Sequence, residues 1–221
     1  MEREIKEFDN EEAFYSALAN DVETLLKSTI NENGVARILL SGGSSPIPLY
    51  QKLAWTDLDW SKIEIGLVDE RFVPRNHEHS NECMIRKMLS LNGKNEIKFH
   101  SMVQEAFDYK CNAEIIEKEY AIFENADLTI LGMGEDGHTA SIFPNDENSE
   151  RCYQASTFTA LTNAPNFPFK RITCTPKTLL SSKNTFLLVK GNKKVDIYQN
   201  TSLNLPIHRL TNAIHASYLL L

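Results

Sequence analysis

The stretch Val35-Ala-Arg-Ile-Leu-Leu-Ser-Gly-Gly-Ser-Ser-Pro46 decides the fold class of this 221-residue chain. Residues 35–41 are a short apolar run that two glycines stop, which is typical of a buried strand. The proline is tolerated in the first turn of a helix, and we predict a helix over residues 46–54. Upstream, apolar side chains recur at helical spacing over residues 10–30, with Asn10 as N-cap and Gly34 after the end.

The same alternation of strands and helices continues along the chain. Strands are predicted over residues 62–69, 127–132, 154–160, 171–175 and 185–190, and helices over 80–91, 108–123 and 192–201. Strands alternating with long helices imply parallel pairing through right-handed crossovers. We therefore predict one α/β domain over residues 1–221, with a mostly parallel sheet flanked by helices and one or two antiparallel strands in the second half. Residues 145–166 are the least regular stretch, which suggests a flap or an inserted loop.

Composition and charge narrow the function classes. The net charge of -7 argues against a protein that binds nucleic acid by neutralising phosphates, but not against a small anionic substrate. No apolar run approaches the roughly 20 residues that cross a bilayer, and the charged start of the chain predicts no secretory signal. The four cysteines lack metal-like or C-x-x-C spacing, so we expect reduced thiols. We expect a cytoplasmic protein with no membrane or nucleic-acid partner, either a monomer or a weak homo-oligomer.

The turn after the first strand is a candidate phosphate site. Gly42 and Gly43 let the backbone approach a ligand, Ser41 and Ser44 carry hydroxyls, and the following helix offers unpaired N–H groups. The pattern is neither Walker A nor G-x-G-x-x-G, so it does not indicate a nucleotide. A tight turn with a serine cap is an equally open interpretation.

Charged residues follow the second strand. Asp69 and Arg71 stand where the carboxyl end of a parallel strand would present them to a ligand, although a solvated strand end with an internal ion pair is also open. His77 and His79 lie a little further on. Two histidines in one loop fall short of the three ligands that a metal site needs, and we predict no metal there.

The segment Leu131-Gly-Met-Gly-Glu-Asp-Gly-His-Thr-Ala-Ser-Ile-Phe-Pro144 carries the strongest candidate chemistry. Its glycines let the backbone turn sharply after a strand, and Asp136 and His138 can both project into a cleft because Gly137 between them has no side chain. A carboxylate beside an imidazole orients a general base and stabilises its protonated form. In the alternative interpretation Asp136 caps a helix and His138 only packs.

Two basic residues complete the candidates. Arg171 opens a predicted strand and Lys194 follows the strand that ends near residue 190. Arginine can bind a phosphate in a bidentate way and lysine as a point charge. Ordinary surface charge is the alternative for both.

These segments, in this order, resemble the 6-phosphogluconolactonase family over nearly the whole chain. The most specific part is Asp136-Gly-His-Thr-Ala-Ser141 followed by Phe143-Pro144. The resemblance implies a Rossmann-like α/β fold and hydrolysis of 6-phospho-D-glucono-1,5-lactone to 6-phosphogluconate, in the oxidative pentose phosphate pathway, without metal or organic cofactor. The chain departs from many relatives in its short C-terminal segment, which leaves the last strand undetermined.

The resemblance also implies roles for individual residues. His138 would be the general base that activates water, and Asp136 would position it. Arg71 would contact substrate or stabilise negative charge on the carbonyl oxygen, and Asp69 would orient neighbouring groups. The phosphate would be bound by residues of the glycine turn and by two basic residues, namely Ser41, Gly42, Gly43, Ser44, Arg171 and Lys194.

Two other functions stay open at this stage. Glucosamine-6-phosphate deaminases resemble the chain in the same segments, but they have a glutamate where Phe143 stands and an aromatic residue where Arg71 stands. A non-catalytic sugar-phosphate sensor would be expected to lose Asp136 or His138 and to carry a further domain. Both alternatives are less consistent with the sequence than the lactonase.

Overall fold

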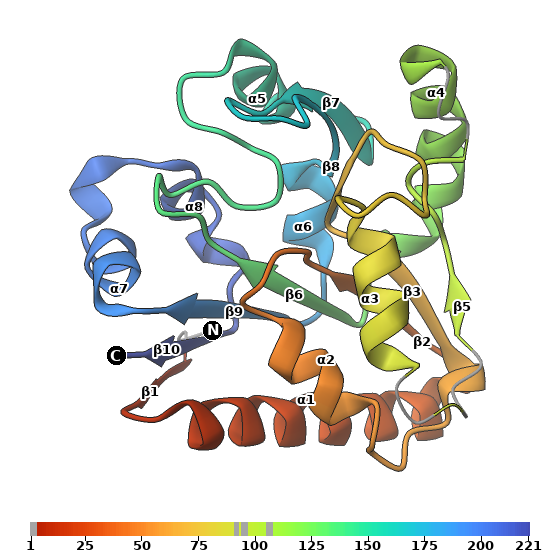
Figure 1. Cartoon of the computed structure of the whole chain (residues 1–221), viewed down its shortest axis with the longest axis vertical. Helices are drawn as coiled ribbons and strands as arrows, with labels where there is room; N and C mark the ends of the chain where they lie inside the picture. The colour runs from red at the N-terminus through yellow and green to blue at the C-terminus, as the bar shows by residue number, and fades with distance from the viewer. Residues whose placement is uncertain (1–3, 91–92, 94–96, 105–107) are drawn as a thin grey trace.

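Seven strands form a parallel sheet in a computed structural model that describes residues 4–90, 93, 97–104 and 108–221 (Figure 1). Each strand runs parallel to its neighbours, which confirms the predicted sheet. In spatial order the strands are β1 (Glu4–Phe8), β10 (Ala216–Leu220), β9 (Thr185–Lys190), β6 (Leu128–Gly132), β2 (Ala36–Leu40), β3 (Ile63–Leu67) and β5 (Lys98–Phe99).

A second, antiparallel sheet adjoins the carboxyl end of β3. Its strands, in order, are β4 (Asp69–Arg71), β8 (Lys170–Cys174) and β7 (Thr159–Asn163). Only Val68 separates β3 from β4, so the chain passes from one sheet to the other at the edge where the loops of the parallel strands gather. The predicted antiparallel strands of the second half are therefore confirmed.

Helices flank the parallel sheet, as predicted. α1 runs along the lower edge of Figure 1 and packs on β1, β2, β10 and α2, whereas α7 packs on β9 and β10. The helices are α1 (Glu11–Asn33), α2 (Ile47–Leu53), α3 (Asn81–Leu89), α4 (Tyr109–Tyr120), α5 (Glu147–Cys152), α6 (Pro176–Ser181), α7 (Asn192–Gln199) and α8 (Pro206–Arg209).

Side-chain caps set where the long helices begin. The side chains of Asn10, Ser80 and Asp108 each accept a hydrogen bond from the N–H three residues later, at the start of α1, α3 and α4. Gly34 ends α1 in the left-handed conformation, with φ of 78°. The predicted end of α3 at Leu91 lies outside the described residues.

Two predictions for the middle of the chain are wrong. The strand expected over 154–160 begins only at Thr159, because α5 ends at Cys152 and turns occupy the residues between them. Residues 145–166 are not an irregular inserted loop, since they contain both α5 and β7, whereas the flap stays a prediction. The segment is attached to α4, where the carboxylate of Glu117 accepts hydrogen bonds from the N–H of Phe158 at 2.8 Å and of Thr159 at 2.9 Å.

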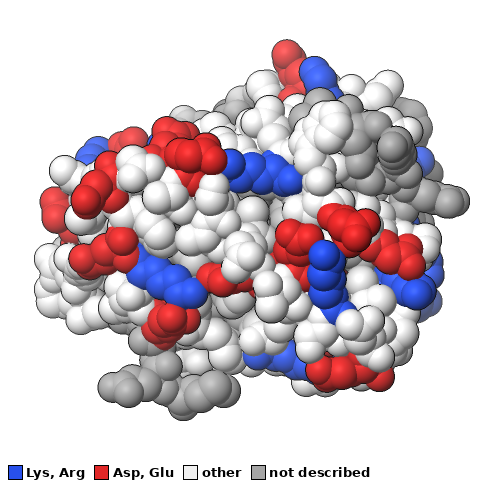
Figure 2. All heavy atoms as spheres, turned by 90° about the horizontal axis from the view of Figure 1, so that it is seen from below, with Lys and Arg blue, Asp and Glu red and all other residues white. Residues whose placement is uncertain are grey.

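The surface carries charges of both signs (Figure 2), and the cysteines form no disulfide among the described residues. The face drawn in Figure 2 carries Lys and Arg interspersed with Asp and Glu. All four cysteines are free thiols. Among the described residues, no helix is both long and apolar enough to cross a membrane.

Candidate active site

The candidate site lies at the carboxyl ends of β2, β3, β6 and β9, where ligands bind in open parallel sheets. Loops from these strands enclose a cavity of about 250 Å³. A second cavity of about 400 Å³ adjoins it, and both are lined by Asp69, Arg71, His138 and Ala140. All the residues that the sequence predicts for the site line one cavity or the other. The first has Ser41, Gly42, Gly43, Ser44, Asp69, Arg71, His138 and Lys194; the second has Asp69, Arg71, Asp136, His138 and Arg171.

The glycine turn after β2 has two glycines with different functions. Gly43 takes a φ of 86°, which few other residues adopt without strain. Gly42 is needed for space instead, because a Cβ there would lie 1.9 Å from Oδ1 of Asn81. In the described part of the chain, no acceptor is bonded to the N–H groups of Gly42, Gly43 or Ser44. The turn therefore presents free donors to the first cavity, as an anion site requires.

Two tyrosines hold the ends of this turn. The Tyr50 hydroxyl donates to the carbonyl oxygen of Ser41 at 2.7 Å, and the Tyr15 hydroxyl donates to that of Ser45 at 2.5 Å. Both rings are fully buried. Because the carbonyl groups are turned toward the core, the neighbouring N–H groups stay available on the cavity side.

Asp136 and His138 form a hydrogen-bonded pair in the loop after β6. The two side-chain atoms Nδ1 of His138 and Oδ1 of Asp136 lie 2.5 Å apart. A Cβ on Gly134 would lie 2.2 Å from the imidazole, so the glycine makes room for the ring. The imidazole also packs against the ring of Phe143, with ring centroids 4.7 Å apart. With Nδ1 bonded to Asp136, Nε2 is the nitrogen that can exchange a proton with a molecule in the cavity.

Contacts with His138 lower the pKa of the Asp136 carboxyl. Burial by itself raises the pKa of the Asp136 carboxyl. The hydrogen bond and the positive charge of His138 outweigh burial, and the pKa ends below its ordinary value. Asp136 is therefore a carboxylate at neutral pH and can balance the charge of a protonated imidazole.

Asp69 and Arg71 both belong to β4, at the boundary of the two cavities. The Asp69 carboxylate accepts a short hydrogen bond from the hydroxyl of Ser141, in the same loop as His138. The guanidinium Nη1 of Arg71 donates to the carbonyl oxygen of His79 at 2.8 Å. These contacts attach β4 to two loops that the sequence separates widely.

Arg171 lies directly opposite Arg71 in the register of β4 and β8. Its side chain is buried, and among the described residues its Nη1 atom has no hydrogen-bond partner. Burial and then the charge of Arg71 lower the pKa of Arg171. Like charges directly opposite each other in a strand pair are unfavourable, and the nearby carboxylates of Asp69 and Glu70 partly offset them.

Lys194 reaches the first cavity from the start of α7. Its Nζ donates to the carbonyl oxygen of Met133 at 2.8 Å, which holds the ammonium group between the loop after β6 and the glycine turn. Lys193 points elsewhere and pairs with Glu135 at 2.7 Å on the surface. Of these two lysines, only Lys194 lines the first cavity.

Several residues that line or support the cavities were not predicted from the sequence. Asn81 lines the first cavity and Ser141 the second, and Ala164, Pro165 and Asn166 border the second from the loop after β7. Asn81 and Ser141 stand within segments that the sequence singles out, but their partners lie in other elements. The rings of His77 and His79 contact each other at a tilt, with ring centroids 5.3 Å apart. Among the described residues, no group of three or more His, Cys, Asp or Glu side chains is placed to hold a metal ion.

Residues 9–216 match the family described as glucosamine-6-phosphate isomerases/6-phosphogluconolactonase. The chain belongs to this family. A relative named 6-phosphogluconolactonase from Pseudomonas putida is 35% identical over 193 residues, which are 86% of this chain and 80% of the relative. Another with that name, from Neisseria meningitidis serogroup A, is 32% identical over 217 residues, 93% of each chain.

Solved structures of the family share the fold. A 6-phosphogluconolactonase from Shewanella baltica has a TM-score of 0.90 at 28% identity, covering 99% of this chain and 97% of its own. One from Thermotoga maritima has a TM-score of 0.86 at 25% identity, covering 99% of both chains. The α/β fold predicted from the sequence is thus the fold of this family.

Proposed function

We propose that the chain is a 6-phosphogluconolactonase, which hydrolyses 6-phospho-D-glucono-1,5-lactone to 6-phosphogluconate in the oxidative pentose phosphate pathway. One observation carries the proposal. The hydrogen-bonded pair Asp136 and His138 stands at a cavity that is also lined by the glycine turn, with its free N–H groups, and by Lys194. That arrangement suits a substrate with a phosphate at one end and a group attacked by water at the other. The names of the relatives support the same activity.

The proposed reaction needs one base and one cation. Nε2 of His138 takes a proton from water, and the resulting hydroxide bonds to the lactone carbonyl carbon. Arg71 balances the negative charge on the carbonyl oxygen in the tetrahedral intermediate. The ring C–O bond then breaks, and the proton held by His138 passes to the departing ring oxygen. Asp136 keeps the imidazole oriented throughout, and Asp69 orients the loop through Ser141.

The phosphate is proposed to lie in the glycine turn. The turn supplies hydrogen-bond donors, namely the N–H groups of Gly42, Gly43 and Ser44 and the hydroxyls of Ser41 and Ser44. The ammonium group of Lys194 adds positive charge. Arg171 is proposed to assist in binding the phosphate, because its buried Nη1 has no hydrogen-bond partner among the described residues. No step of this scheme requires a metal or an organic cofactor.

The rival activity, deamination of glucosamine 6-phosphate, is less consistent with the site. Deaminases of this family have a glutamate at the position of Phe143, as the resemblance implies. Phe143 is buried and packs on the His138 ring, so an apolar side chain stands where that carboxylate would act. The site therefore lacks the carboxylic acid that would assist the opening of an amino-sugar ring.

The test is a pair of assays on purified protein. Decay of freshly made 6-phosphogluconolactone is followed without added metal, for the parent chain, His138→Ala and the control His77→Ala. The proposal expects strong acceleration by the parent and the control and little by His138→Ala. Unchanged lactone decay together with ammonia release from glucosamine 6-phosphate would identify a deaminase instead.

Three broader features are also proposed. The chain acts as one catalytic domain, because the active-site loops come from strands in both halves of the sequence. It works in the cytoplasm, where its four free thiols stay reduced. It functions as a monomer or a weak homo-oligomer.

A further inference from the structure

We infer that Glu70 is a positioning residue of the active site, whose buried carboxylate fixes Arg71 on one wall of the cavity and Asn81 on another. The inference rests on the proposed function for its kinetic test. Glu70 lines neither cavity, and its side chain is only 2% exposed. It lies between Asp69 and Arg71, with its side chain on the opposite face of β4.

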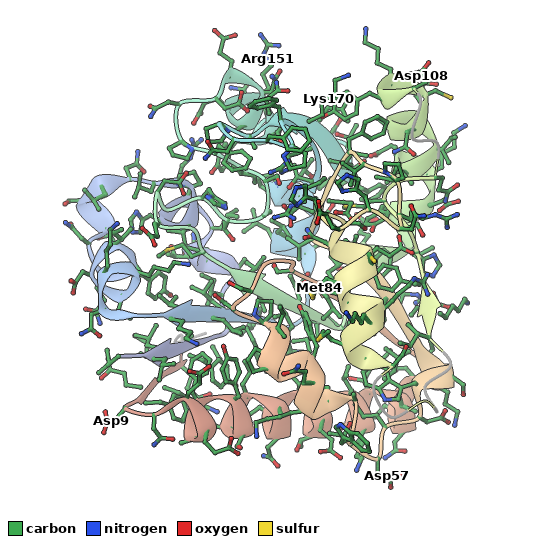
Figure 3. All side chains as sticks on the ribbon, viewed as in Figure 1. Asp9, Asp57, Met84, Asp108, Arg151 and Lys170 are labelled. Atoms are coloured by element: carbon green, nitrogen blue, oxygen red, sulfur yellow. The ribbon has the colours of Figure 1, made fainter. Side chains whose placement is uncertain are left out.

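The Glu70 carboxylate accepts four hydrogen bonds from nearby donors. Oε1 accepts from the N–H of Arg71 at 2.7 Å and of Asn81 at 2.8 Å. Oε2 accepts from the Ser80 hydroxyl and from the N–H of Glu82, each at 2.9 Å. Three of the four donors belong to the start of α3, the helix on which Met84 is labelled in Figure 3. One carboxylate thus joins the end of β4 to the first turn of α3.

Two further contacts close the same ring of residues. The Asn81 side-chain amide donates to the carbonyl oxygen of Asp69 at 2.9 Å, and Arg71 donates to the carbonyl oxygen of His79. The loop over residues 72–79 is therefore held at both ends. Because Glu70 supplies four of these bonds, it is the group on which the others depend.

The consequence reaches the glycine turn through Asn81. The Asn81 amide lies so close to Gly42 that a Cβ there would overlap it. Any shift of the first turn of α3 would therefore move the back of the turn that is proposed to bind phosphate. Arg71, held by the same carboxylate, lines both cavities. Glu70 thus sets the distance between the proposed phosphate site and the proposed oxyanion partner.

The chemistry requires a carboxylate at this position. The first N–H groups of a helix have no partner within the helix, and their positive potential favours a negative group. Burial raises the pKa of Glu70 to about 7, although the four hydrogen bonds act in the other direction. A glutamine has one acceptor oxygen and a donor NH₂ in place of the second oxygen, so Glu70→Gln leaves at least one buried donor without a partner.

Glu82 provides the matched control. It is also a buried carboxylate, 3% exposed, and it starts the same helix. Its side chain accepts from Nε of Arg86 at 2.8 Å and from the Ser101 hydroxyl at 2.9 Å, away from both cavities. Glu82→Gln therefore removes a charge of similar burial and keeps the backbone N–H of residue 82 that donates to Glu70.

The test measures kcat and KM of both variants for the lactone above pH 7, well below their unfolding temperatures. Hydrogen exchange of the backbone amides of Arg71 and Asn81 is measured alongside. We expect Glu70→Gln to lower kcat/KM at least tenfold, through both kcat and KM, and to speed exchange at both amides, while Glu82→Gln stays within twofold of the parent. A folded Glu70→Gln with parental kcat/KM and parental exchange would overturn the inference, and so would equal losses in both variants.

Two outcomes need a separate measurement. If Glu70→Gln does not fold, exchange in the parent chain decides, because first-turn amides are ordinarily unprotected. Slow exchange at Asn81 and Glu82 would support the bonds to Glu70, and fast exchange would overturn them. If the parent has no lactonase activity, the proposed function fails. The exchange difference between the two variants then still tests whether Glu70 holds Arg71 and Asn81.

Discussion

The Nδ1 atom of His138 lies 2.5 Å from Oδ1 of Asp136, and the backbone N–H of His138 donates to the same oxygen at 3.1 Å. One carboxylate oxygen therefore fixes both the ring and the main chain of the residue two positions later. This double contact depends on Gly137, whose φ of 77° bends the loop between them. It leaves Nε2 as the free nitrogen of the ring.

We predict that the two members of this pair differ in how their loss acts. His138→Ala should lower kcat by about 10²- to 10⁴-fold, the usual contribution of a general base. Asp136→Asn keeps the size of the side chain but can stabilise the wrong imidazole tautomer, so kcat should fall about tenfold or more with little change in KM. Steady-state kinetics on the lactone measures both. Parental kcat in Asp136→Asn would show that the carboxylate does not orient the base.

The contact between Gly134 and His138 gives a second prediction. A methyl group at Gly134 would lie 2.2 Å from the imidazole and 2.8 Å from Oδ1 of Asp136, so Gly134→Ala must displace the ring. We expect a loss of kcat close to that of His138→Ala. The double variant serves as control, because residues that act as a unit are not additive, and it should be no slower than His138→Ala alone. A further loss in the double variant would mean that Gly134 acts elsewhere.

The two neighbouring lysines of α7 separate the phosphate site from general surface charge. Lys194→Ala should raise KM roughly 10- to 100-fold with a small change in kcat, because a charged hydrogen bond to a remote group contributes about 1.5–3 kcal/mol to binding. Lys193→Ala changes the same net charge but removes only the exposed pair with Glu135, so its KM should stay parental. Equal KM values in the two variants would contradict the proposed phosphate site.

Local signals explain how much of the fold could be predicted from the sequence. The helix caps Asn10, Ser80 and Asp108 act on N–H groups within a few residues, so their pattern is visible in the chain. The predicted strand over residues 185–190 coincides with β9, which is an apolar run with clear ends. β1 was not predicted, because Glu4-Ile-Lys-Glu-Phe8 is a half-exposed edge strand whose charges hide the alternation.

In the candidate site, too, only the contacts between residues close in sequence could be predicted. The sequence placed Asp136 and His138 together because only one residue separates them. It could not show that Ser141 bonds to Asp69, 72 positions earlier, or that Arg171 stands opposite Arg71. It also could not show that Gly42 accommodates a side chain from α3, since that contact depends on how the helix packs. The chemical type of each site residue was predictable, whereas the residues that it contacts depend on how distant elements pack together.

The unpredicted edge strand β1 gives the last prediction, which concerns stability and pH. Asp21 on α1 accepts from Nζ of Lys6 on β1 at 2.7 Å and from the hydroxyl of Tyr218 on β10 at 2.6 Å. Burial by itself would raise the pKa of Asp21, but these two partners outweigh it and lower the pKa from 3.8. The pKa of Lys6 is raised from 10.5, because the bond to Asp21 and its charge outweigh the effect of burial. The pair should therefore stabilise the folded state between these two values.

Asp21→Asn should lower the free energy of unfolding by about 1 kcal/mol near neutral pH, the upper end for a partly exposed ion pair. A carboxyl whose pKa is lowered by folding contributes above its unfolded pKa and loses that contribution as pH falls through the folded value. An ammonium whose pKa is raised contributes below its unfolded pKa and loses that contribution as pH rises through the folded value. Denaturant unfolding across pH should then show a difference between parent and variant that is constant near neutrality and shrinks below pH 3.8 and above pH 10.5. Glu7→Gln, an exposed change on the same strand, should show no such window, and a pH-independent loss in Asp21→Asn would assign the effect to packing rather than charge.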